Sequence, residues 1–223
     1  PLETMKNAWN YLGLALVGYS LVYGLISTVP ALPIVNETIR NLYYHVPMWF
    51  TMISLMGASF GYSIGALQSN SLKKDRTAAA FSEVALVFAA AGLLTGMLWA
   101  KFTWGAFWTP DPKLNGTAIT ILIYLAYFVL RGSVDDPEKR LRLSATYNIF
   151  AFVLMLVFIM VLPRLTDSLH PGNGGNPAFG AYDLDNTMRL VFYPAVVGWI
   201  LVGFWMARLR ARLQNLRQPL DLH

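Results

Sequence analysis

The sequence contains no cysteine and few charged residues. Of its 223 residues, 13% are charged and 56% are hydrophobic. The absence of cysteine excludes disulfides, thiolate metal sites, thioether-linked cofactors and cysteine nucleophiles. A soluble domain usually has about a quarter of its residues charged, which keeps its surface hydrated. The composition therefore favours a protein whose surroundings are themselves apolar.

The sequence contains long apolar runs. Six stretches have about the 20 residues that a helix needs to cross a bilayer, and helices are expected because open sheet edges cannot satisfy their backbone groups in lipid. No connection between them is long enough to fold alone. The sequence predicts an all-α integral membrane protein, a bundle of six transmembrane helices in one domain over 1–223. The predicted spans are about 8–29, 47–67, 78–100, 114–130, 144–162 and 190–207.

The basic residues indicate the orientation. Most of the 17 lysines and arginines fall on one side of the predicted bundle. They are Lys6, Lys73, Lys74, Arg76, Arg131, Lys139, Arg140, Arg142, Arg208, Arg210, Arg212 and Arg217. Cytoplasmic loops of membrane proteins carry such an excess, so both termini are expected inside. The net charge of +5 then reflects topology in a lipid bilayer, and no nucleic-acid partner is expected.

The outer connections, about 30–46, 101–113 and 163–189, hold two of the three histidines. His45 ends the first connection and His170 lies in the last, so both should lie on one side of the membrane at a similar depth. His223, the last residue, is expected on the inner side without a role. Imidazole is a good ligand for iron, and haem iron takes one axial ligand on each face. Two such histidines could hold a haem, although one loop histidine alone is more often simply solvated.

The connection 101–113 is unusually aromatic. Trp104, Phe107 and Trp108 lie within five positions, together with Gly105 and ahead of Asp111. Tryptophans near a membrane surface are ordinary anchors, but this density would also suit a flat apolar macrocycle such as a porphyrin.

These residues resemble a known signature. The run Trp104-Gly-x-Phe-Trp-x-x-Asp111-x-Lys-Leu is similar to the tryptophan-rich WWD motif, in the form found in the cytochrome c maturation haem-transfer protein C family (CcmC). The likeness extends to His45-Val-Pro before the second span, to six helices with both ends inside, and to His170. Phe107 and Pro110 stand where tryptophan is usual, and Lys113 stands where arginine is usual.

The resemblance implies a haem carrier rather than an enzyme. Haem b would be held transiently at the outer, periplasmic face of a bacterial inner membrane, with His45 and His170 as axial ligands. It would then pass to a membrane-anchored periplasmic haem chaperone, beside subunits of an ABC-type transporter, for cytochrome c biogenesis. The candidate haem-binding residues are His45, His170, Trp104, Phe107, Trp108, Asp111, Lys113 and Arg189.

Haem propionates need cationic partners, and the outer candidates are Arg40, Lys101, Lys113, Arg164 and Arg189. Arg189 is the best placed of them, at the start of the sixth span. Asp111 could orient a tryptophan N–H, cap the fourth helix or contact a partner, with Asn115 the better expected cap.

Glu83 is an acid inside an apolar span, near its inner end. Intramembrane carboxylates are candidates for function, but a lysine or arginine nearby would give Glu83 a structural role. The expected partners are Lys73, Lys74 or Arg76.

Three other functions remain open. A transmembrane cytochrome b that transfers electrons usually holds haem between histidines within its helices, and no histidine falls mid-span here. A haem lyase of the same superfamily would be much longer. A small-molecule transporter tends to have broken helices and polar groups at the midplane, whereas these spans read as largely apolar there.

Overall fold

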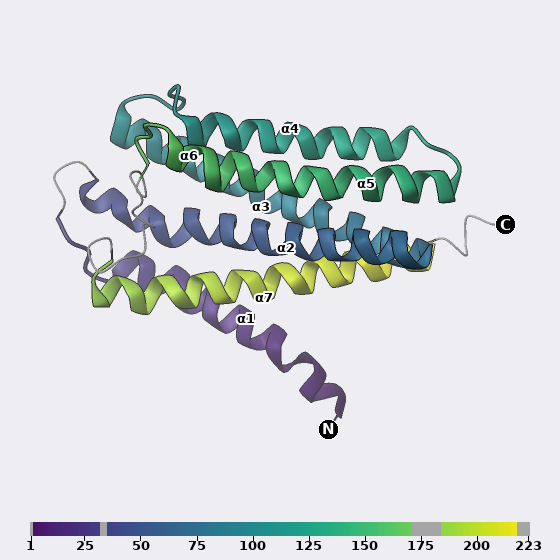
Figure 1. Ribbon diagram of the computed structural model, residues 1–223. Coiled ribbons are helices and arrows are strands. Elements are labelled where there is room, and N and C mark those ends of the chain that lie inside the picture. Colours follow the sequence, from purple (N-terminus) through teal and green to yellow (C-terminus); the bar gives the residue numbers. More distant parts are fainter. Residues whose placement is uncertain (1, 32–34, 171–183, 218–223) are drawn as a thin grey trace.

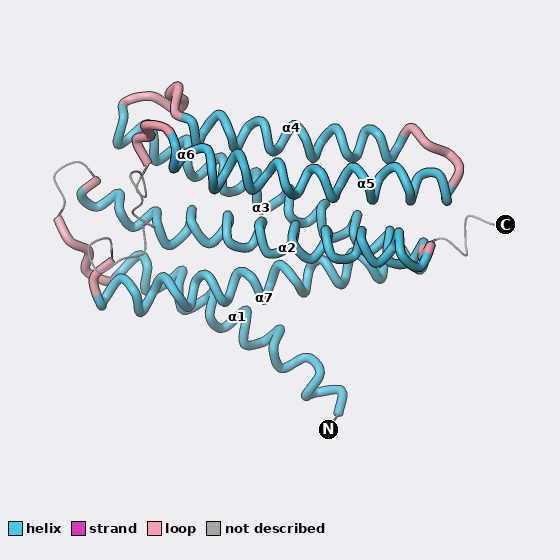
Figure 2. Tube along the Cα trace, viewed as in Figure 1, coloured by secondary structure: helices cyan, strands magenta, loops and turns pink. Residues whose placement is uncertain are grey.

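The computed structural model describes residues 2–31, 35–170 and 184–217, and this part of the chain is helical (Figures 1 and 2). Six helical stretches of it are long and apolar enough to cross a membrane, which confirms the predicted fold class. The elements are α1 (Leu2–Ile26), η1 (Asn36–Asn41), α2 (Leu42–Ser69), α3 (Leu72–Trp104), α4 (Pro112–Gly132), α5 (Pro137–Leu156), η2 (Val157–Val161), α6 (Leu162–Leu165) and α7 (Asn186–Arg217). The π-helical η2 joins α5 and α6 into one span.

Two ends of the bundle can be distinguished in Figure 1. The histidine end, at the left, holds the connection from α1 to η1, the α3–α4 connection (105–111) and the segment after α6 (166–170). The basic end, at the right, holds the last turn of α7 and the turns at 70–71 and 133–136, while α1 begins below the bundle, apart from the other helices. Residues 171–183 of the third predicted outer connection, and His223, lie outside the described residues.

Helix capping explains why α3 and α5 begin earlier than the predicted 78 and 144. The Ser71 hydroxyl accepts a hydrogen bond from Lys74 N–H, and the Asp136 carboxylate accepts one from Lys139 N–H before Pro137 at the first helical position. Such caps satisfy the free N–H groups of a first turn. The polar segments that were expected to be loops are therefore the first turns of helices.

The second helix likewise starts before the predicted Pro47. Ile39, Leu42 and Tyr43 are buried against α7, where they contact Met188 and Phe192. This burial stabilises the turns ahead of Pro47, although proline cannot donate to a preceding carbonyl. His45 consequently lies on a helix rather than in a loop.

Small residues let the helices approach closely. A Cβ atom on Gly13 of α1 would lie 2.9 Å from the Leu201 Cβ of α7, and one on Gly198 would lie 2.9 Å from Leu16 Cβ. Close backbone approach through glycine is the usual way in which helices associate in lipid. The main core lies among α2, α3, α5 and α7, built around Met52, Leu55, Met56, Phe81, Phe88 and Met155.

The basic end is fastened by ion pairs between helices. Arg131 at the end of α4 donates two hydrogen bonds to the buried Asp75 of α3, at 2.7 and 2.5 Å. Glu83 pairs with Arg210 and Gln214 of α7, so the expected partners Lys73, Lys74 and Arg76 were wrong. Those residues lie on the same helix as Glu83, about two turns or more away, whereas α7 packs directly beside it.

A buried polar cluster lies inside the bundle, in the half toward the basic end. Asn148 of α5 donates to Ser59 and Ser63 of α2 at 2.7 and 2.8 Å, and the Ser59 hydroxyl is 2.8 Å from that of Ser82 on α3. All four residues are buried. The sequence does not predict this cluster, because short hydroxyl side chains within an apolar run are a weak signal.

Candidate haem-binding site

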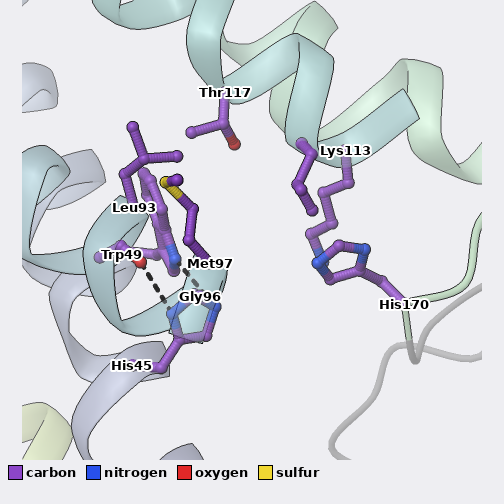
Figure 3. A pocket seen from close by; sticks show the side chains of 10 residues that line it. His45, Trp49, Leu93, Gly96, Met97, Lys113, Thr117 and His170 are labelled. Carbon is purple, nitrogen blue, oxygen red and sulfur yellow. Dashed lines mark hydrogen bonds between the residues drawn. The ribbon is translucent and has the colours of Figure 1, made fainter. Parts of the chain in front are cut away.

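A cavity at the histidine end separates two halves of the bundle. His45, Trp49, Leu93 and Met97 lie on the side formed by α2 and α3, and the other side carries Lys113, Thr117 and His170 (Figure 3). The two histidines that the sequence singled out, distant in the chain, thus line one cavity. The full lining is His45, Trp49, Gly92, Leu93, Gly96, Met97, Lys113, Leu114, Thr117 and His170.

Two glycines of α3 make room for the His45 side of the cavity. A Cβ atom on Gly96 would lie 2.6 Å from Cε1 of His45, and one on Gly92 would lie 2.7 Å from Cε2 of Trp49. The glycines and the two rings share a spacing of four residues, which places each pair on one helix face. Nδ1 of His45 lies 2.9 Å from the Gly92 carbonyl oxygen, so the backbone of α3 fixes the ring.

Asp111 fixes the other histidine. Its Oδ1 lies 2.9 Å from Nδ1 of His170, and its Oδ2 accepts hydrogen bonds from the Ser168 hydroxyl at 2.8 Å and Leu169 N–H at 2.7 Å. The Asp111 side chain is fully buried and that of His170 is 19% exposed. An ionised carboxylate only accepts, so Nδ1 carries the hydrogen and the lone pair of the neutral ring is on Nε2. A carboxylate in this position orients a ligating histidine and raises its basicity.

The local environment sets both protonation states. Burial alone would raise the pKa of Asp111, but hydrogen bonds from His170, Leu169 N–H and Ser168 outweigh it and hold that pKa well below the usual range. Burial lowers the pKa of His170 below 6.5, and the bond to Asp111 only partly offsets this effect. At neutral pH the pair is therefore an ionised carboxylate and a neutral imidazole, the form that binds metals.

Asp111 is also the N-cap of α4, which corrects the expectation that Asn115 would cap this helix. Its Oδ1 accepts hydrogen bonds from Lys113 N–H at 2.9 Å and Leu114 N–H at 3.3 Å. The helix starts earlier than predicted because Pro112 suits its first position. One carboxylate therefore fixes the start of α4 and the ring of His170 together.

The aromatic residues divide between two environments. Trp104, the last residue of α3, contacts the His170 ring edge-on, with centroids 4.9 Å apart. Phe107 and Trp108 are 51% and 41% exposed beyond it, after Gly105 turns the chain with a φ of 82°. Trp104 thus belongs to the surroundings of the cavity, whereas Phe107 and Trp108 form an exposed aromatic surface beside it.

The predicted cations also divide. Lys113 lines the cavity, and its ammonium has no hydrogen-bond or ion-pair partner among the described residues. Arg189 is not among the residues lining the cavity. The other three bond to backbone carbonyls: Arg40 to Gly24 and Ser27, Lys101 to Gly105, and Arg164 to Met160.

Sequence reasoning missed several residues around His45. Trp49 donates its N–H to Nε2 of His45 at 3.2 Å, and the Thr95 hydroxyl lies 3.1 Å from Nδ1. Trp99 contacts the same ring edge-on, at a centroid distance of 5.9 Å. Met97 also lines the cavity. The four-residue spacing of His45 and Trp49, matched by Gly92 and Gly96, was the available signal.

The donor set of this cavity suits a haem iron, but its volume does not hold a porphyrin in this conformation. Two neutral imidazoles, apolar side chains and one cation are the groups that haem requires. The cavity has about 30 Å³, against roughly 300–1,000 Å³ for pockets that enclose a ligand of drug size. Binding would require the α2–α3 side to move away from the side formed by α4 and the segment after α6.

Comparison with known proteins identifies the family of the chain. A family model described as heme exporter protein C matches residues 2–221. The chain belongs to the heme exporter protein C family. Several proteins named heme exporter protein C are similar in sequence to this chain over much of its length. The relative from Bradyrhizobium diazoefficiens is 32% identical over 60% of this chain, and those from Paracoccus denitrificans and Haemophilus influenzae are 25% and 22% identical over 83% and 96%.

The coverage of these heme exporter proteins varies. The alignment spans 48% of the Bradyrhizobium protein, 76% of the Paracoccus protein and 86% of the Haemophilus protein. Membership of the family therefore rests on the match to nearly the whole of this chain.

Proposed function

We propose that the protein is a haem carrier for cytochrome c biogenesis. Haem b is held transiently at the histidine end, with its iron between His45 and His170, and is then handed to a membrane-anchored haem chaperone. The observation that carries this proposal is that these two histidines, 125 positions apart in the numbering of the chain, line one cavity from opposite sides. The family to which the chain belongs, described as heme exporter protein C, supports the cargo.

The surroundings of His170 support its role as a ligand. Asp111 holds Nδ1–H, which leaves the Nε2 lone pair for iron, and Trp104 packs against the ring edge. Lys113, which lines the same cavity, is the best-placed partner for a haem propionate. Arg189, at the start of α7 and off the cavity, would reach a propionate only at the edge of an opened site.

Hand-over requires that part of the cargo remain accessible. Phe107 and Trp108 expose large apolar rings next to the site, and such rings can cover the porphyrin edge or contact the partner. The family is described as a heme exporter, and we propose this protein as a carrier rather than an enzyme.

The proposed placement follows from the two ends. The basic end faces the cytoplasm by the positive-inside rule, with both termini there, and the histidine end faces the periplasm across a bacterial inner membrane. The single six-helix domain would work beside subunits of an ABC-type transporter. The bilayer and these proteins, and not nucleic acid, are the partners.

Absorption spectroscopy tests this proposal. Detergent-purified wild-type protein should show a Soret band and sharp reduced α and β bands, either as isolated or after addition of haem. The double variant His45→Ala/His170→Ala should lose them. His223→Ala is the matched control, since it removes the remaining histidine, and its spectrum should equal that of the wild type. Equal haem content in the double variant and the wild type would refute the ligand assignment.

A further inference from the structure

The nitrogen of His45 that iron would need is already bonded within the protein. Trp49, one turn further along α2, donates its indole N–H to Nε2 of His45 at 3.2 Å. The bond is drawn in Figure 3, together with the one between Nδ1 and the Gly92 carbonyl. Both nitrogens of this imidazole therefore have partners in the structure.

The direction of these bonds fixes the tautomer. A carbonyl oxygen only accepts, so Nδ1 of His45 carries the hydrogen and gives it to Gly92. An indole N–H only donates, so Nε2 must offer its lone pair to Trp49. The same lone pair would coordinate iron. A neutral imidazole has only one such lone pair, so the Trp49 bond and an iron bond to His45 exclude each other.

We propose that Trp49 is a latch that takes the Nε2 lone pair of His45 when haem leaves. The inference rests on the proposed carrier function and adds a release device to it. A buried acceptor without a partner is costly. By supplying a replacement donor, Trp49 lowers the free energy of the haem-free state and so favours hand-over. Trp49 is a positioning residue in this account, since it acts through His45.

The fit of Trp49 against α3 supports the latch. Gly92 leaves space that a Cβ atom would fill, 2.7 Å from the indole, so the ring can lie beside His45. Trp99 provides a contrast. Its ring lies at the same centroid distance from His45 as that of Trp49, 5.9 Å, and at a similar interplanar angle, 77° against 76°. Its N–H, however, donates to the Thr38 hydroxyl at 3.1 Å. Two tryptophans thus contact one histidine, and Trp49 is the one whose N–H competes for Nε2.

The test compares haem affinity and release in Trp49→Phe, Trp99→Phe and wild type. Haem titration gives the affinity, and transfer to apomyoglobin, a general haem acceptor, gives the release rate. Trp49→Phe should bind haem roughly 2- to 10-fold more tightly, the range for the net worth of one buried hydrogen bond. A water molecule in the cavity would replace part of the lost bond and move the effect toward the lower value. Trp99→Phe should stay within about twofold of wild type, because no bond to Nε2 is lost.

A second variant keeps the test decisive if phenylalanine packs poorly at position 49. Benzothienylalanine, which has the shape of tryptophan but a sulfur in place of the N–H, retains the ring contacts and removes only the donor. Tighter binding and slower release in both position-49 variants support the latch. Unchanged or weaker binding in the benzothienylalanine protein overturns it while leaving the carrier function standing. A wild type that takes up no haem would overturn both.

Discussion

The two ends of the bundle use their polar side chains differently. At the basic end, Asp75 and Arg131 satisfy each other, and Glu83 pairs with Arg210 across α3 and α7. At the histidine end, Asp111 accepts hydrogen bonds from five donors that all belong to the α4 start and the His170 segment. The groups at the basic end form closed pairs between helices, whereas Asp111 bonds only one of the two imidazole nitrogens of His170.

The difference indicates that the polar groups of the basic end stabilise the fold, whereas those of the histidine end can bind a ligand. A closed pair fastens two helices, and its two charges neutralise each other instead of attracting a ligand. At the histidine end, the Nε2 atom of His170 and the ammonium of Lys113 lack partners among the described residues, and both belong to residues that line the cavity. Changes at the basic end should therefore alter stability, and changes at the histidine end should alter haem binding.

The largest effect is expected from Arg131→Met. The substitution leaves the buried Asp75 carboxylate without its partner, which costs about 3–5 kcal/mol of unfolding free energy for a pair of this kind. Denaturation in detergent would measure the loss, and haem affinity of the folded protein should stay within about twofold of wild type. Asp75→Asn/Arg131→Met, which removes both charges, should recover most of the stability. If Arg131→Met lowered haem affinity as much as the substitutions of His45 and His170, the proposed division of roles between the two ends would be wrong.

The next effect is on haem affinity, from Asp111→Asn. In the wild type, Leu169 N–H and His170 Nδ1–H donate to the carboxylate oxygens of Asp111. The asparagine amide would place an NH₂ group against one of these donors, so the substitution no longer fixes the tautomer of His170. Loss of such a partner usually weakens a metal site about 10- to 100-fold, and haem titration would measure it. Asp136→Asn is the matched control, because Asp136 caps α5 ahead of a proline in the same way but at the basic end. Equal affinities in the two variants would show that Asp111 acts as a cap alone.

The smallest effect is on pH dependence. The pKa of His170 lies below 6.5 in the folded protein, so the folded state holds fewer protons than the unfolded state as the pH falls through that value. The stability contribution of neutral His170 is complete above pH 6.5 and is lost as the pH falls toward the folded-state pKa. Haem affinity should change by less than about twofold between pH 8 and pH 6.5, and decline at lower pH. A decline already centred above pH 6.5 would contradict a neutral, buried His170.

The helices were predictable because their signal is long and strong. Six apolar runs are visible in the sequence, and a membrane leaves few alternatives to helix. The starts of three helices were not predictable, because Ser71, Asp111 and Asp136 cap first turns whose polar residues resemble loop sequence. At the second helix, the turns before Pro47 depend on burial against α7, a contact that no local pattern reveals.

The site was predictable in part for a similar reason. Membrane topology alone placed His45 and His170 on one side, and they line one cavity. The bond from Asp111 to His170 depends on how α4 and the segment after α6 pack, so sequence reasoning left the role of Asp111 open. Trp49 lies one helical turn from His45 in the sequence, but that spacing alone does not distinguish it from the many aromatic residues of the tryptophan-rich connection.

The central claim is that iron is bound between His45 and His170, and spin-state spectroscopy with imidazole rescue tests it most directly. Haem-loaded wild-type protein should be six-coordinate and low-spin in the oxidised state. His45→Ala and His170→Ala should each give five-coordinate, high-spin haem, and added imidazole should restore the low-spin spectrum by filling the space of the missing ring. Low-spin spectra in both single variants without imidazole would contradict the account and place the iron ligands elsewhere.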